Sequence, residues 1–252
     1  MFNPFSLNEK TILITGASSG IGRQCAIACS NMGARIIAVA RNTERLQETL
    51  SQLKGEGHSC YSIELSNCDD IKSLVAKIVN ENGKLDGIIC AAGIERTMPA
   101  KLLTPADYEE VFRINTVSAF ELVSQATTVK YFNAGGSVVL ISSITSLIAR
   151  QGTAAYSASK GAMVSGARVL AAELSKRKIR VNCISPGTIL TPLMQNFLDT
   201  LNEDDYKKRT SGFPLGLGKP EDVANASIYL LSDASRWVTG QNFVIDGGFT
   251  IQ

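Results

Sequence analysis

The residues Thr15-Gly16-Ala17-Ser18-Ser19-Gly20-Ile21-Gly22 largely decide how the chain folds. They follow an apolar stretch at 11–15 and lead directly into a helical pattern at 22–31. A glycine-rich turn between a strand and a helix lets backbone N–H groups approach a pyrophosphate at the helix N-terminus. The turn therefore predicts a dinucleotide site near the start of an α/β domain.

The same turn also matches G-x-S-x-G, the arrangement in which some hydrolases expose a nucleophilic serine. Such a hydrolase needs a histidine late in the chain, after its acidic residue. His58 is the only histidine, and it precedes most of the predicted sheet, which disfavours the hydrolase. A glycine-rich turn without any ligand is the other alternative, and the turn taken alone leaves it open.

Short apolar stretches alternate with helical patterns along the whole chain. The stretches are rich in Ile and Val, as in parallel strands buried on both faces. They predict strands at 11–15, 35–40, 60–65, 87–90, 137–142, 180–184 and 242–246. The patterns between them predict helices at 22–31, 43–53, 69–80, 105–131, 155–176 and 220–231. No linker or repeat divides the chain, so residues 1–252 predict one α/β domain with helices on both faces of a parallel sheet.

Residues 188–213 interrupt this alternation. They carry an apolar set that includes Leu193, Met194 and Phe197, followed by a polar run at 202–205. An insertion of this length after a strand is typical of a substrate lid. A surface helix packed on the edge of the domain is an equal alternative.

The overall composition indicates an ordinary globular protein, with 44% hydrophobic and 19% charged residues. A formal net charge of +2 gives no reason to expect a nucleic acid or an anionic membrane as partner. No stretch is apolar enough for a spanning helix, and the first residues lack the pattern of a secretory signal. Six cysteines without a Cys-x-x-Cys pair indicate reduced thiols in a cytoplasmic protein, and a single histidine argues against a metal site.

Five further motifs follow the glycine turn in order. They are Cys90-Ala91-Ala92-Gly93 after a strand, Asn115 in the long central helix, Ser142-Ser143 at a strand end, Tyr156-x-x-x-Lys160, and Pro186-Gly187 with Thr191. With these motifs the chain resembles the short-chain dehydrogenase/reductase family nearly from end to end. The resemblance implies a Rossmann-like, doubly wound parallel sheet of about seven strands in a single domain.

The resemblance also implies the site. Its catalytic tetrad would be Asn115, Ser143, Tyr156 and Lys160. The residues expected to bind the cofactor are Gly16, Ser18, Ser19, Gly20, Ile21, Gly22, Arg41, Glu64, Leu65, Ala92, Gly93, Tyr156, Lys160, Pro186, Gly187, Ile189 and Thr191. Two positions depart from the family. Cys90-Ala91 replaces a pair of asparagines, which puts local rigidity in doubt, and Glu64 stands where an aspartate more often contacts adenine.

The chemistry of carbonyl reduction explains these residue types. Hydride transfer to a carbonyl leaves negative charge on oxygen, so a proton donor must lie beside it. Tyr156 and Lys160 are four residues apart in a helical pattern, on one face, and the ammonium is expected to lower the high pKa of the phenol. Ser143 would hold the substrate oxygen, and Asn115, as the family implies, would hold a water that links Lys160 to solvent. Alone, Tyr-x-x-x-Lys is more often an exposed pair on an amphipathic helix.

The residues after the second predicted strand indicate which nicotinamide cofactor is used. An NAD-binding enzyme of this architecture has an acid there for the ribose 2′-hydroxyl. Here the strand ends in Ala40-Arg41-Asn42, and an arginine can bind a 2′-phosphate and stack on adenine. We therefore expect NADP(H) to be preferred over NAD(H), by roughly ten- to a hundredfold. The alternative is an exposed arginine without consequence.

The substrate is less clearly indicated. The layout is similar to that of 3-oxoacyl-acyl-carrier-protein reductases, which meet an acidic carrier with basic residues. Arg177 matches one such position and Ala134 occupies the other, so an acyl carrier protein is one candidate partner, with Lys176–Lys178 as helix-end cations the alternative. A free ketone, sugar or polyol is the competing substrate class. Arg150, Gln151 and Arg96 are the residues that could reach it.

Two expectations concern the whole molecule. A non-catalytic NADP sensor is the alternative outside the enzymes, and the complete tetrad argues against it. By resemblance, the C-terminal strand and the long helices that carry Asn115 and Tyr156 pack against neighbouring subunits, which implies a homotetramer.

Overall fold

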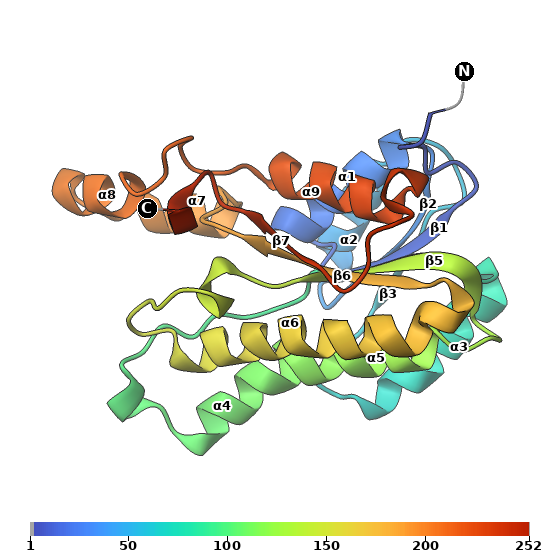
Figure 1. The fold of residues 1–252 in the computed structure, drawn as a ribbon, viewed down its shortest axis with the longest axis horizontal. Coiled ribbons are helices and arrows are strands. Elements are labelled where there is room, and N and C mark those ends of the chain that lie inside the picture. The colour runs from blue at the N-terminus through green and yellow to red at the C-terminus, as the bar shows by residue number, and fades with distance from the viewer. Residues whose placement is uncertain (1–2, 252) are drawn as a thin grey trace.

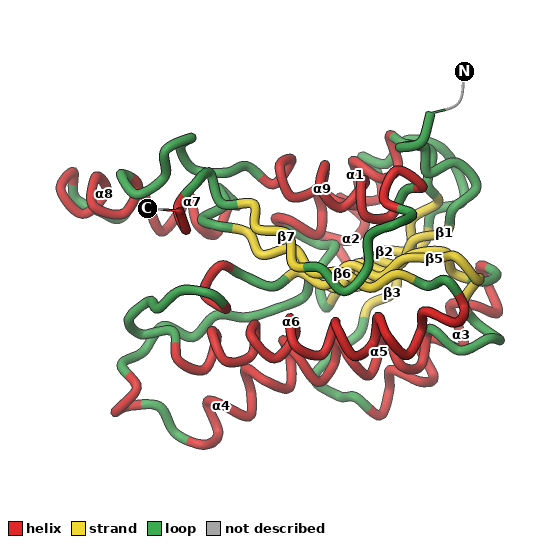
Figure 2. The backbone as a smooth tube through the Cα atoms, in the orientation of Figure 1, coloured by secondary structure: helices red, strands yellow, loops and turns green. Residues whose placement is uncertain are grey.

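A computed structural model describes residues 3–251. Its centre is one seven-stranded sheet in which every pairing is parallel, with the strand order β3-β2-β1-β4-β5-β6-β7 (Figures 1 and 2). The strands are β1 (Thr11–Thr15), β2 (Arg35–Ala40), β3 (Ser59–Ser62), β4 (Leu85–Cys90), β5 (Phe132–Ile141), β6 (Arg180–Pro186) and β7 (Asn242–Ile245). The predicted Rossmann-like, doubly wound parallel sheet is confirmed.

The order of the strands reverses between β1 and β4. The chain runs outward from β1 to β2 and β3, and then returns to place β4 on the other side of β1. In open α/β sheets, ligands bind at such a switch point, beyond the carboxyl ends of the strands. The glycine turn after β1 therefore lies beside the segment that follows β4.

Helices cover both faces of the sheet (Figure 1). One face carries α1 (Gly20–Asn31), α2 (Thr43–Leu50) and α9 (Pro220–Leu231). The other carries α3 (Asp69–Asn82), α4 (Pro105–Phe112), α5 (Ser118–Ala126) and α6 (Ala154–Leu174). Neighbouring strand residues point to opposite faces, so Ile12 joins the core under α1 and α9 while Leu13 joins the core under α5 and α6. Both cores are built almost entirely of aliphatic side chains and cysteines.

Several predicted boundaries are wrong. The helix predicted at 105–131 is interrupted by a π-helical turn at Arg113–Val117 and ends at Ala126. The next strand begins at Phe132 instead of residue 137, because Gly135 and Gly136 continue it past a register irregularity opposite β4. The strand predicted at 60–65 runs from 59 to 62, and beyond it only the N–H of Ile63 still bonds to β2.

Residues 188–213 fold into two short helices. They are α7 (Pro192–Leu198), capped by the Thr191 hydroxyl, and α8 (Glu203–Thr210), capped by the Asn202 side chain. Figure 1 shows α8 at the same end of the molecule as the amino end of α6. The segment closes with Phe213, whose ring packs against Phe249 near the C-terminus, with 4.6 Å between centroids.

Candidate active site

The glycine turn after β1 fits closely against the end of β4. A Cβ atom on Gly16 would lie 2.8 Å from the backbone nitrogen of Ala92, and one on Gly22 would lie 2.3 Å from the carbonyl oxygen of Gly16. Gly16 and Gly20 also have φ values of 67° and 52°, which favour glycine. The space where side chains would stand is thus filled by backbone, and this brings the start of α1 up to the switch point.

The amino end of α1 is suited to an anion. Its first turn contains no acidic residue, and within residues 3–251 the Ser19 side chain makes no capping hydrogen bond to it. The first N–H groups of a helix have no partner within the helix and attract negative charge. The turn therefore fits the pyrophosphate of a dinucleotide.

Thr15, the first residue of the quoted turn, and two residues that the sequence did not single out, Arg23 and Thr49, hold the turn in place. Thr15 accepts hydrogen bonds from the N–H groups of Ala91 and Ala92, both at 3.2 Å, with its side-chain oxygen. Arg23 donates to the carbonyl of Ser18 at 2.7 Å, and Thr49 donates to the carbonyl of Ala17 at 2.9 Å. Only the folded chain brings these partners together. The Thr15 contacts tie the segment after β4 to the end of β1.

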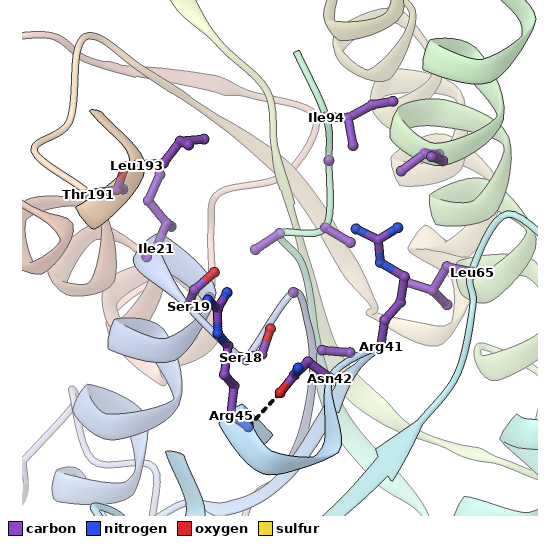
Figure 3. A pocket seen from close by; sticks show the side chains of 18 of the residues that line it. Ser18, Ser19, Ile21, Arg41, Asn42, Arg45, Leu65, Ile94, Thr191 and Leu193 are labelled. Atoms are coloured by element: carbon purple, nitrogen blue, oxygen red, sulfur yellow. Dashed lines mark hydrogen bonds between the residues drawn. The ribbon is translucent and has the colours of Figure 1, made fainter. Parts of the chain in front are cut away.

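A cavity of about 500 Å³ extends from this turn across the carboxyl ends of the strands (Figure 3). This volume is typical of a small-molecule site. Twelve of the predicted cofactor residues line it: Gly16, Ser18, Ser19, Gly20, Ile21, Gly22, Arg41, Glu64, Leu65, Ala92, Gly93 and Thr191. Its other lining residues are Ala40, Asn42, Arg45, Ile63, Ala91, Ile94, Ile114, Pro192, Leu193 and Asn196, which had not been predicted.

The remaining predicted cofactor residues lie beyond this cavity. Pro186 ends β6, and Gly187 follows it so close to Asp246 that a Cβ would lie 2.9 Å from the Asp246 Cα. Ile189 forms an isolated parallel bridge with Gly218. These residues lead from the sheet into α7, whose amino end lines the cavity through Thr191.

Two arginines face the far end of the cavity (Figure 3). Arg41 follows β2 and pairs with Glu64, with 3.3 Å between the guanidinium and the carboxylate. Both side chains are well exposed, so this ion pair contributes little to stability. Arg45 comes one turn into α2, which Asn42 caps by accepting the Arg45 N–H at 2.7 Å. The sequence contained a signal for Arg45 as a second cation near Arg41. A helix that begins after Asn42 brings residue 45 close to residue 42, and therefore close to Arg41.

Asn115 and Lys160 lie at the opposite end of the cavity. A Cβ on Gly93 would lie 3.1 Å from the Asn115 side-chain oxygen and 3.4 Å from the Lys160 Nζ. Asn115, in the π-helical turn, accepts the Ile94 N–H at 2.8 Å and donates to the Ile94 carbonyl at 2.9 Å. Its side chain therefore clamps the segment after β4. Gly93, which lacks a side chain, lies between the cavity and these side chains.

Ser143 and Tyr156 complete the group. Ser143 follows β5, and its side-chain oxygen accepts the N–H of Thr145 at 3.2 Å. Its hydroxyl also acts on the Tyr156 side chain and lowers the pKa of that phenol. The Lys160 ammonium lies 5.7 Å from the centre of the Tyr156 ring. The four residues predicted as a tetrad are thus brought together by three separate elements, the π-helical turn, the end of β5 and α6.

The pKa of Tyr156 is opposite to expectation. It is raised to about 12, because burial and the carboxylate of Glu95 outweigh the hydrogen bond from Ser143 and the charge of Arg150. The Lys160 Nζ donates to the carbonyl of Ile141, 2.7 Å away, and not to the Tyr156 hydroxyl. Burial lowers the pKa of Lys160 to about 8, although the neighbouring Cys183 and Cys90 favour its charged form. The expected ammonium-lowered phenol is therefore wrong for the protein alone.

Four other charged or polar positions from the sequence fall into two groups. Arg96 forms ion pairs with Asp107 and Glu110, both in α4, and so ties the segment after β4 to that helix. Arg177 donates to the backbone carbonyls of Thr127 and Phe132. Arg150 stands near Tyr156 instead and pairs with Glu95, while Gln151 beside it is exposed.

The fold and the site together define a dinucleotide-dependent oxidoreductase acting on a carbonyl or alcohol. A family model described as enoyl-(acyl carrier protein) reductase matches residues 16–250. A D-threitol dehydrogenase of Mycolicibacterium smegmatis is 35% identical over 98% of this chain and 95% of that protein. A 3-oxoacyl-acyl-carrier-protein reductase of Thermotoga maritima is 34% identical over 97% of this chain and 99% of that protein.

Solved structures agree with the sequence relatives. A dehydrogenase/reductase from Sinorhizobium meliloti 1021 has a TM-score of 0.90 and 28% identity, with 98% of this chain and 97% of that chain covered. The chain belongs to the short-chain dehydrogenase/reductase family. It is accordingly an oxidoreductase of the kind that uses a nicotinamide cofactor. Within residues 3–251, no helix is both long and apolar enough to cross a membrane.

Proposed function

We propose that the protein interconverts a ketone and a secondary alcohol with NADP(H), with Tyr156 exchanging the proton. The observation that carries this is the Lys160 ammonium 5.7 Å from the centre of the Tyr156 ring, with Ser143 acting on the same phenol, next to a cavity that suits a dinucleotide. The cofactor, when bound, supplies or accepts the hydride. Ser143 holds the substrate oxygen against the Tyr156 hydroxyl, so that a proton can pass as charge develops on oxygen.

Lys160 and Asn115 support this exchange. A lysine with a pKa of about 8 can gain or lose a proton near neutral pH, so Lys160 can replace a proton that Tyr156 gives up. The Asn115 side chain holds the segment after β4. We propose that it also positions a water between Lys160 and solvent.

Replacing Tyr156 by Phe tests the enzyme against the alternative of a non-catalytic NADP sensor. We expect turnover to fall by about 10²- to 10⁴-fold, the usual contribution of a general acid. NADPH binding, followed by fluorescence titration, should stay within about twofold, since the ring is kept and only the hydroxyl is lost. Tyr131→Phe, before the amino end of β5 and away from the site, is the matched control for a lost phenolic hydroxyl. Wild-type protein that binds NADPH but reduces no carbonyl would favour the sensor.

The preference for NADP(H) rests on the charges at the far end of the cavity. Ala40 stands where an NAD enzyme would carry an acid, and Arg41 and Arg45 both line that end. Among the described residues the Arg45 side chain has no ion pair, whereas Arg41 is shared with Glu64. Arg45 is therefore the better placed of the two to bind a 2′-phosphate, with Arg41 assisting it.

Comparing kcat/KM for NADPH and NADH tests this preference. Arg41→Asp and Arg45→Asp should each lower the NADPH value by roughly ten- to a hundredfold and leave the NADH value nearly unchanged. Lys72→Asp, an exposed charge reversal on α3, should change neither value. Equal use of both cofactors by the wild type would overturn the preference.

The contacts of Arg177 favour a free small molecule over an acyl carrier protein. Its guanidinium donates hydrogen bonds to two backbone carbonyls. The position where a carrier-protein reductase would have a second basic residue is occupied by Ala134. A free ketone, sugar or polyol is therefore the substrate class we propose, in line with the relative named as a threitol dehydrogenase. Faster turnover of an acetoacetyl-carrier substrate than of any free ketone would reverse this choice.

The remaining proposals concern the molecule as a whole. Residues 188–213 act as a substrate lid, hinged where Phe213 packs on Phe249. The protein is a cytoplasmic homotetramer. All six cysteines are free, and large apolar side chains are exposed at Val117 and Val169 on the long helices and at Trp237, Val244 and Ile251 near the C-terminus. Sedimentation as a monomer would refute the tetramer.

A further inference from the structure

Glu95 and Arg150, which act on Tyr156, also act on Arg209, although the three side chains lie on segments far apart in the sequence. Glu95 follows β4, Arg150 precedes α6, and Arg209 lies in α8 within residues 188–213. Arg150 and Glu95 form an ion pair at 3.6 Å, with side chains 31% and 33% exposed. Both charges act on the Tyr156 hydroxyl, in opposite directions. The cluster therefore belongs to the substrate side of the site, away from the arginines that face the cofactor.

Arg209 is unusual in its surroundings. Its guanidinium lies over the ring of Phe197, 5.9 Å from the centroid. Its Nε is buried and, within residues 3–251, has no hydrogen-bond partner. Burial and the charge of Arg150 lower the pKa of Arg209, while Glu95 raises it, which places all three groups within electrostatic reach of one another. An arginine does not escape this cost by losing its proton.

The charges in the cluster do not balance. Two guanidinium groups face one carboxylate, and Glu95 is already paired with Arg150. Within residues 3–251, one positive charge, on an arginine with a buried N–H, therefore has no anion of its own. A carboxylate is the planar, singly charged partner that a guanidinium binds with two parallel hydrogen bonds. A phosphate dianion would bring a second negative charge against Glu95.

We propose that Arg209 and Arg150 form a carboxylate-binding subsite, and that the substrate is a small hydroxy acid or oxo acid. This inference rests on the proposed function, because it places the carboxylate next to the carbon that Tyr156 serves. The acid joins Arg209 of the segment 188–213 to Arg150 of the fixed loop before α6. Substrate binding and closure of the lid would thereby be coupled through one anion.

The test compares acids with neutral alcohols of the same length. Glycerate, threonate, xylonate and gluconate are paired with glycerol, threitol, xylitol and glucitol, and each is titrated calorimetrically into wild-type protein saturated with NADPH. With the reduced cofactor bound no alcohol is oxidised, so this measures binding alone. The same compounds are then assayed for turnover with NADP⁺.

We expect at least one acid to bind roughly ten- to a hundredfold more tightly than its neutral counterpart. Arg209→Gln should remove that advantage, raising KM for the acid with little change in kcat, and Arg209→Lys should restore part of it. Lys208→Gln, an exposed cation next to it on α8, should leave all values unchanged and controls for net charge.

Two results would overturn the subsite. One is that no acid binds more tightly than its matched alcohol, and the other is that Arg209→Gln weakens acids and neutral alcohols equally. Tight binding of acids that depends on Arg209, without turnover of any compound, would sustain the subsite and refute the proposed function. The two proposals therefore fail separately.

Discussion

The buried ammonium of Lys160 should lower the stability of the protein in a way that pH reveals. Its side chain is only 4% exposed, and Nζ donates to the Ile141 carbonyl at 2.7 Å and contacts the Met163 sulfur at 3.7 Å. Burial lowers the pKa of Lys160 from 10.5 to about 8. At 1.36 kcal/mol per pH unit, this fall corresponds to a cost of about 3 kcal/mol for keeping the charge in the folded state.

The direction of the pH effect follows from which state holds the proton. Below pH about 8 both states are protonated, and the full cost is present. Between about 8 and 10.5 the unfolded chain still binds the proton and the folded one does not, so the free energy of unfolding rises with pH. Above that range the cost has disappeared. Lys160→Met, which keeps the length of the side chain, removes this titration.

The expected result has two parts. At pH 7 the methionine variant should be the more stable protein by about 0.5–2 kcal/mol. Removing the buried charge stabilises the variant, but the Ile141 carbonyl loses its hydrogen-bond donor, which costs about 1–3 kcal/mol. Between pH 7 and 10 the wild type should gain roughly 2–3 kcal/mol relative to the variant. Shifts at Tyr156 and at the buried cysteines occur in both proteins and cancel in the difference.

Urea denaturation followed by circular dichroism at pH 7, 8, 9 and 10 would measure the difference, under reducing conditions and at one protein concentration. Lys208→Met, at an exposed position, is the control for replacing any lysine and should run parallel to wild type. Parallel curves for Lys160→Met and wild type would refute the reasoning, since they would mean that Lys160 is no harder to charge in the folded protein. A wild type that lost stability relative to the variant on going from pH 7 to 10 would refute the sign.

Three further outcomes follow from single contacts. Gly22→Ala would place a Cβ 2.3 Å from the Gly16 carbonyl oxygen, so the affinity for NADPH should fall by more than about tenfold. The circular dichroism spectrum should stay the same. Unchanged affinity would show that the backbone of the turn can shift to make room for the Cβ. Thr15→Val removes the acceptor for two backbone N–H groups and should cost about 1–3 kcal/mol in urea unfolding, whereas Thr11→Val at the other end of β1 should cost less. Arg180→Met leaves the Leu230 and Ser232 carbonyls and the Ser235 hydroxyl without their buried donor, and should lower stability by about 2–4 kcal/mol; a loss below about 0.5 kcal/mol would contradict these contacts.

Much of the fold could be predicted because its signals are local. The runs of Ile and Val in β1 and β2 gave both strands with correct ends, and the glycine turn fixed the strand–helix unit. The break in the long helix could not be predicted in the same way. It depends on Asn115 bonding to Ile94, a residue 21 positions away, and no periodicity in the helix itself records that partner.

The site shows the same division between residue type and surroundings. Spacing predicted that Tyr156 and Lys160 share a helix face, and they do. It could not predict that Nζ turns to the Ile141 carbonyl, or that Glu95 approaches the phenol, because both are set by how strands and loops pack around α6. Arg96 and Arg177 illustrate the converse, since sequence alone cannot distinguish an arginine that meets a ligand from one that closes a loop.

Two placements of charge around the site are costly to the folded protein. Lys160 keeps a charge where burial opposes it, and Arg209 keeps a buried N–H that has no partner among residues 3–251. Neither placement strengthens the fold, and each could be relieved by an uncharged side chain of similar size. Such costs persist where ligands offset them: a cofactor and a hydride acceptor beside Lys160, and an anion beside Arg209. If so, the protein should gain more thermal stability from NADPH and a bound acid together than from the sum of each alone, because the acid closes Arg209 onto a site that the cofactor has already ordered.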